Sequence, residues 1–209
     1  MTIHRRNLCA LGIGAAFAGS AFARSALAQQ PGMAPVGAGT PAYPVGHRVE
    51  PFHHDEIVHA AADFFGVAAQ TVAGVIEKAF HDNGEPTAYV AGEEVAGAVA
   101  VGLRYGHGEM YMKHRPRRRV YWQGPSIGFD FGGNASRVFT LAYNIQDFDQ
   151  IFQRFPGVEG SIYFVAGFGM NYQRLDDITL APIRTGVGAR AGANVGYLDY
   201  SRKQHILPF

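Results

Sequence analysis

The sequence has almost no cysteine, because Cys9 is the only one among its 209 residues. A chain with one cysteine forms no internal disulfide, so burial of apolar side chains must stabilise the fold. The sequence also lacks a phosphate-binding loop, a dinucleotide fingerprint and a serine in a nucleophile-elbow context. We therefore expect no cofactor, no catalytic residue and a protein that is not an enzyme.

The sequence also lacks an apolar run long enough to span a bilayer. The longest apolar stretch, residues 8–22, follows the basic pair Arg5-Arg6 and precedes Ala26-Leu27-Ala28, a small-x-small cleavage pattern. This arrangement predicts a signal peptide over residues 1–28, export to the periplasm and no membrane span. The arginine pair is compatible with twin-arginine export, and the general route stays open as an alternative.

Charge of one sign is not in excess. The chain has 18 Lys and Arg against 17 Asp and Glu, and residues 1–28 contain Arg5, Arg6 and Arg24 but no acidic residue. The mature chain therefore has 15 basic and 17 acidic residues, a net charge of −2. Periplasmic export excludes nucleic acid as a partner.

Two helices are expected after a linker. Residues 29–54 are rich in proline, glycine and alanine without an apolar period, which predicts a linker. Residues 55–65 and 68–80 then carry apolar side chains at helical spacing, and Gly66 and Asn83-Gly84 are stop signals. The pattern predicts a helical hairpin over residues 55–82, at the start of a single domain over residues 55–209.

The rest of the domain reads as strands without crossover helices. Alternating patterns cover 95–105, 126–132, 137–143, 160–172, 178–184 and 185–200, with a helical turn near 147–154. Turns are expected at 106–108, 124–125 and 133–134, where glycine stands with His, Pro or Asn. We expect a mainly β fold, in which about eight strands form a small antiparallel barrel over residues 88–200, with a meander topology. An open sandwich is the alternative.

Five segments of this region resemble a known family, the alphaproteobacterial EipA family. They are 92–94, 102–106, 120–128, 154–161 and 186–197, and the resemblance extends from about Asp55 to Phe209. It implies a periplasmic β-barrel that supports cell-envelope integrity and resistance to envelope stress. It implies no catalytic residue. A weaker likeness to SYLF lipid-binding domains rests on strands in which glycine alternates with other residues.

Two groups of residues are candidates for ligand binding. Asp130, Arg190 and Asn194, with Arg104, lie on the glycine-bearing faces of their strands. Facing inward they would grip a ligand head group, but the larger apolar residues compete for the interior, so an outward face is favoured. The second group is a basic loop, defined here as residues 113–119, which contains Lys113, Arg115, Arg117, Arg118 and Arg119.

The basic loop predicts contact with an anionic envelope component, namely lipid, lipopolysaccharide or a wall polymer. A plain solvated hairpin tip is the alternative. The cluster His53, His54 and His59 lacks the spacing of a metal site, so no metal is expected. Besides a non-catalytic envelope protein, two functions stay open. One is a lipid-binding barrel of the SYLF type, and the other is a wall hydrolase using Glu93 and Glu159.

Overall fold

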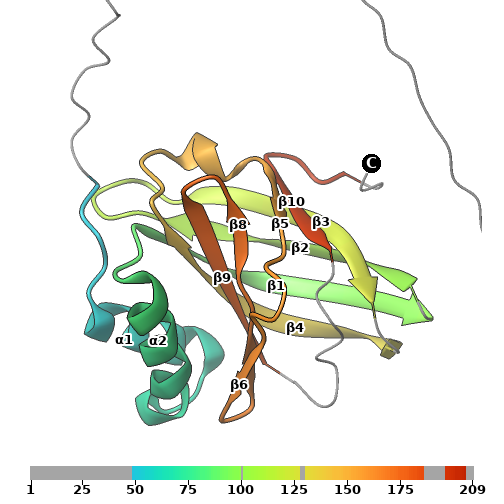
Figure 1. The fold of residues 1–209 in the computed structure, drawn as a ribbon, viewed down its shortest axis with the longest axis horizontal. Helices are drawn as coiled ribbons and strands as arrows, with labels where there is room; N and C mark the ends of the chain where they lie inside the picture. Colours follow the sequence, from blue (N-terminus) through green and yellow to red (C-terminus); the bar gives the residue numbers. More distant parts are fainter. Residues whose placement is uncertain (1–48, 100, 128–129, 186–195, 206–209) are drawn as a thin grey trace, which may run out of the picture. The chain divides into compact units, whose positions relative to one another are not determined.

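A computed structural model describes residues 49–99, 101–127, 130–185 and 196–205, without the side chains of 96–102 and 126–134 (Figure 1). The helices are α1 (His54–Phe65) and α2 (Ala69–Asn83). The longer strands are β1 (Ala88–Val99), β2 (Val101–Tyr111), β3 (Arg118–Ile127), β4 (Asp130–Tyr143), β9 (Ile178–Thr185) and β10 (Tyr197–Ser201). The short elements are η1 (Phe148–Ile151), β5 (Arg154–Pro156), β6 (Tyr163–Val165), β7 (Phe168–Met170) and β8 (Gln173–Leu175).

The helical hairpin forms as its sequence predicts. A capping box, in which the Glu56 carboxylate accepts from the His53 N–H at 2.7 Å, starts α1. Gly66 ends the helix in the left-handed region, with φ of 70°, where glycine carries no steric penalty. Neither helix has the length and apolar character needed to cross a bilayer within the described residues.

All strand pairs among the described residues are antiparallel, and the sheet curls into a half-barrel (Figure 1). Its order is β5-β10-β3-β2-β1-β4-β9-β7-β6, with β8 also paired to β9. One end of this order is joined to β8, because Gly157 after β5 forms an antiparallel bridge with Gln173 of β8. The prediction of a mainly β, barrel-like domain preceded by a helical hairpin is therefore confirmed. A plain meander is wrong, because β3 and β4 are consecutive but lie on opposite sides of the β1–β2 hairpin.

The two faces of the sheet build two apolar clusters. On β4, Val138 and Ala142 face the curl interior, together with Val90, Met110 and Trp122. The alternate β4 residues, Phe139, Leu141 and Tyr143, pack under α1 and α2. A strand buried on both faces needs apolar residues at both parities, and β4 has them.

Three expected turns are strand residues instead. Gly106, His107 and Gly108 lie within β2, where they pair with Glu94, Glu93 and Gly92 of β1. Gly124-Pro125 lies within β3 and pairs with β2. Gly133-Asn134 lies within β4. Glycine at Gly106 and Gly124 serves close approach, because a Cβ would overlap the Trp122 ring at the first and the Tyr197 carbonyl at the second.

The predicted long strand over residues 160–172 is also wrong. It is a hairpin of β6 and β7, whose turn uses Ala166 and Gly167 at positive φ. The parity changes across the turn, because Tyr163 and Val165 of β6 lie on the same face as Met170 and Phe168 of β7, and Phe164 is exposed. The expected strand over 185–200 is described only at its ends, in β9 and β10, because residues 186–195 lie outside the described part of the chain. The alternation over 126–132 is likewise interrupted, since β3 ends at Ile127 and β4 begins at Asp130.

Candidate functional site

A polar cluster lies inside the curl of the sheet. The strand register places Glu94 of β1 opposite Gly106 of β2, Gly106 opposite Trp122 of β3, and Trp122 opposite Tyr200 of β10. Because Gly106 has no side chain, the Trp122 indole lies across it toward β1. This arrangement brings groups from two strands on either side of β2 into direct contact.

Glu94 is the centre of this cluster and is only 4% exposed. Its Oε2 accepts a 2.8 Å hydrogen bond from Trp122 Nε1. Its Oε1 accepts a 3.0 Å bond from Arg184 Nε of β9, and Arg104 Nε lies 3.3 Å from the same oxygen. Both guanidinium-bearing side chains are 13% exposed, so the ion pairs are largely shielded from water.

The electrostatics keep Glu94 ionised. Burial alone raises the pKa of its carboxyl, but Arg104, Arg184 and the Trp122 hydrogen bond outweigh that effect, and the pKa lies below its usual value. A carboxylate held in this way is a poor proton donor at neutral pH. Arg184 is fixed further by Asn171, whose Oδ1 accepts from Nη1 at 2.9 Å. The cluster therefore has the character of a structural anchor that joins β1, β2, β3 and β9.

The predicted inner-face candidates are placed only in part. Arg104 faces the interior, so the preference for an outward face is wrong for this residue, and its acidic neighbour is Glu94. Arg190 and Asn194 lie outside the described residues. Asp130 begins β4, but its side chain is not among those described. Gly92 and Gly106 on this face leave space for the indole of Trp122.

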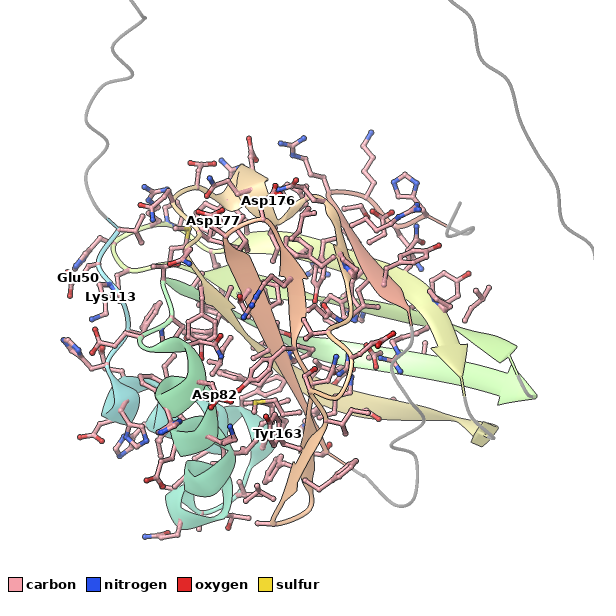
Figure 2. All side chains as sticks on the ribbon, in the orientation of Figure 1. Glu50, Asp82, Lys113, Tyr163, Asp176 and Asp177 are labelled. Atoms are coloured by element: carbon pink, nitrogen blue, oxygen red, sulfur yellow. The ribbon has the colours of Figure 1, made fainter. Side chains whose placement is uncertain are left out.

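The cations of the basic loop form ion pairs with carboxylates of neighbouring segments. Figure 2 shows Lys113 beside Glu50. Its Nζ lies 3.0 Å from Glu50 Oε1 and 2.8 Å from Glu56 Oε2. The other pairs are Arg115 with Asp147 at 3.3 Å, Arg117 with Glu109 at 3.1 Å and Arg118 with Asp149 at 3.5 Å. Carboxylates of the neighbouring segments therefore compensate much of the positive charge of this loop.

The loop nevertheless displays its outer cations to solvent. Arg117 and Arg118 have side chains that are 65% and 56% exposed, whereas Lys113 is 11% exposed and lies over the Phe52 ring. Arg118 and Arg119 belong to the first residues of β3 rather than to the loop itself. The surface-facing part of the cluster is therefore residues 117–119.

The histidines His53, His54 and His59 contact different partners. His53 Nδ1 lies 2.8 Å from Glu85, and His54 Nδ1 lies 3.2 Å from Asp55. His59 Nδ1 lies 2.7 Å from the carbonyl of Asp55. Within the described part of the chain, no three His, Cys, Asp or Glu side chains converge as metal ligands would.

The acidic candidates for hydrolysis, Glu93 and Glu159, are exposed residues of different segments. Glu93 is exposed on the outer face of β1, and its neighbour Glu94 is buried, as expected for adjacent residues of a strand. Glu159 is exposed in the segment between β5 and β6. Ser161 supports the closure of the sheet, because its Oγ donates to the Val158 carbonyl at 2.6 Å and accepts from the Tyr172 N–H at 3.0 Å.

Sequence reasoning did not identify Glu94, Trp122 and Arg184 as a unit. Arg184 continues the alternation of Ile178, Leu180 and Pro182, so its inward direction could be read from the parity of β9. For Glu94, the sequence signal was its position two residues after Gly92, which places both residues on the same face of β1. The contact between Glu94 and Arg184 could not be predicted from local sequence, because the two residues are 90 positions apart.

Comparison with known proteins agrees with this architecture. A crystal structure of a beta-barrel-like, uncharacterized protein from Brucella abortus is similar to this chain, with a TM-score of 0.69 and 44% sequence identity. The similarity covers 76% of this chain and 99% of that one. No curated protein matches the sequence. The family model described as envelope integrity protein A matches residues 50–209, and the chain belongs to this family, EipA.

Proposed function

We propose that this protein acts in the periplasm as a non-catalytic component that supports the integrity of the cell envelope under stress. The observation that carries the proposal is the match of the EipA family model over residues 50–209. The leader pattern of residues 1–28 supports a periplasmic location. Residues 55–209, which follow the linker, are then the domain of the mature protein that carries out this function.

The interior supports a non-catalytic role. The one buried glutamate of the interior cluster is held ionised by two guanidinium groups and an indole, which leaves it no proton to donate. Around it, the buried apolar side chains of the described residues form one packed cluster. These features favour a rigid scaffold over a wall hydrolase or a lipid carrier.

We further propose that the scaffold contacts an anionic envelope component through residues 117–119 of the basic loop. The exposure of Arg117 and Arg118 supports this contact, since cations at the surface add attraction toward anionic lipid or lipopolysaccharide phosphates. The neighbouring carboxylates moderate that attraction, so the contact is weak and reversible.

Deletion of the gene tests the proposal. Cells without it should become more sensitive to detergent and to inhibitors of wall synthesis. The full gene should restore resistance, whereas a version without residues 2–28 should not, because its product stays in the cytoplasm. Unchanged sensitivity of the deletion strain, or full rescue by the version without the leader, would overturn the proposal.

A further inference from the structure

A pocket of about 90 Å³ opens on the outer face of β1, β2, β3 and β10. Most of its lining side chains belong to the face of the sheet opposite to Glu94, and Gly106 and Trp122 also border it. Strand register builds it from two neighbouring rows of outward-facing residues. Val95 lies opposite Tyr105 and Tyr105 opposite Gln123 in the first row, and His107 opposite Tyr121 and Tyr121 opposite Ser201 in the second.

The residues after β10 form one wall of this pocket. Gln204 and His205 are part of its lining. The segment that carries them is held in place by Arg202, whose Nη2 lies 2.8 Å from Asp149 and whose guanidinium lies over the Phe152 ring. The wall therefore has a fixed position beside the two tyrosines.

The chemistry of the lining selects a class of ligand. Among the described residues that line the pocket, none is Lys, Arg, Asp or Glu, so the pocket offers no fixed charge to a phosphate or an amine. Tyrosine, glutamine, histidine and serine instead supply hydrogen-bond donors and acceptors.

We propose that this pocket binds one sugar ring of an envelope polysaccharide, through the aromatic rings of Tyr105 and Tyr121 and the exposed polar side chains of Gln204 and His205. A pyranose has an apolar C–H face that packs on an aromatic ring and an edge of hydroxyl groups that pair with amides. The small, open shape accommodates one unit of a longer chain that runs across the sheet, rather than a whole enclosed ligand. This inference rests on the proposed envelope function.

Titration calorimetry on the mature full chain tests the inference with two probes. One is wall glycan strands freed of their peptides, and the other is lipopolysaccharide-derived polysaccharide freed of its lipid. Binding of either probe supports the inference and identifies the source of the sugar. Absence of binding to both would overturn it, while leaving the proposed function to be judged by the gene deletion.

Variants then locate the site. Tyr121→Ala and Gln204→Ala should each weaken binding, by roughly tenfold for the tyrosine because it removes the stacking surface. Tyr121→Phe should retain most of the affinity. Gln204 is exposed beyond β10, so its replacement tests the pocket even where loss of a tyrosine perturbs the sheet. Phe164→Ala, on the exposed β6–β7 hairpin, is the control. Equal loss of affinity in Phe164→Ala and the pocket variants would refute this location.

Discussion

Trp122 donates a 2.8 Å hydrogen bond from its indole nitrogen to Glu94, although a whole strand lies between them. The indole crosses β2 at Gly106 and reaches Gly92 of β1, and a Cβ at either position would overlap the ring. The missing side chains of these glycines thus allow an aromatic ring and a buried carboxylate to meet. The stability of the interior depends on that space.

Gly106→Ala should therefore destabilise the protein. The methyl group forces Trp122 out of its position, and overpacking of this kind costs about 2 kcal/mol of unfolding free energy. Urea unfolding followed by fluorescence measures the loss directly, since Trp122 is the only tryptophan. Gly74→Ala in α2 is the matched control, because its Cβ meets only the Val165 Cγ1 methyl at 3.0 Å. Equal stability of Gly106→Ala and the parent would contradict this account of the glycine.

Glu94→Gln should be more damaging than the same change at the adjacent residue. Loss of the charge leaves Arg184 buried without its carboxylate, and breaking one side of a buried ion pair costs roughly 3 kcal/mol. Glu93→Gln alters an exposed group on the other face and should change the unfolding free energy by less than about 0.5 kcal/mol. Chemical denaturation of the two variants side by side checks the difference. Similar values for both would mean that the Glu94 cluster does not anchor the sheet.

The sequence predicts the helices and the class of the fold more securely than the turns. Helical spacing and the Gly66 stop define α1 because both signals are local. Glycine in a strand pattern is ambiguous, since it marks either a turn or a close approach. Gly106 and Gly124 are close approaches, and what they approach, Trp122 and the Tyr197 carbonyl, is set by strand pairing. Local pattern therefore misplaced the turns while the strand content remained correct.

The interior site shows the same limit. Parity alone indicates that Glu93 and Glu94 face opposite ways. It does not indicate which of the two is inside, because Gly92 and Gly106 on the Glu94 face look like a thinly packed surface. The inner face became identifiable only with the register that aligns Glu94, Gly106 and Trp122.

Asp82 links α2 to the outer face of the sheet, and its loss should remove part of the acid sensitivity of the fold. Asp82 Oδ2 accepts a 2.7 Å bond from the Tyr172 hydroxyl, and Lys78 Nζ lies 2.5 Å from the same carboxylate. The hydrogen bond from Lys78, helped by those from Tyr172 and His81, lowers the pKa of Asp82 to about 2. Since the pKa is lower in the folded state than the ordinary aspartate value of 3.8, the contribution of Asp82 to stability is present above about pH 4 and is lost as the pH falls toward 2.

Asp82→Asn should thus lower the unfolding free energy at pH 7 by about 1 kcal/mol, a value reduced for partial exposure to solvent. The gap between variant and parent should close between pH 4 and pH 2, approximately the interval between the two pKa values. Thermal unfolding across that range measures it, with Asp63→Asn on the exposed side of α1 as the control. A constant gap at all pH values would show that the carboxylate charge does not contribute.

The basic loop yields a prediction in two directions, because its cations and their paired carboxylates can be changed separately. Arg117→Ser, Arg118→Ser and Arg119→Ser together should weaken sedimentation with anionic phospholipid vesicles at low salt. The fold should persist, since exposed ion pairs contribute only about 0–1 kcal/mol each.

Glu109→Gln with Asp149→Asn removes the acids beside Arg117 and Arg118 and should strengthen sedimentation, because those cations then lose their internal counter-charge. High salt should diminish binding of the parent and of the acid-to-amide variant alike, as screening shortens the reach of surface charge. If all three proteins sediment equally at low salt, residues 117–119 are an ion-paired strand start that contacts no anionic surface, and the binding role proposed for them is wrong.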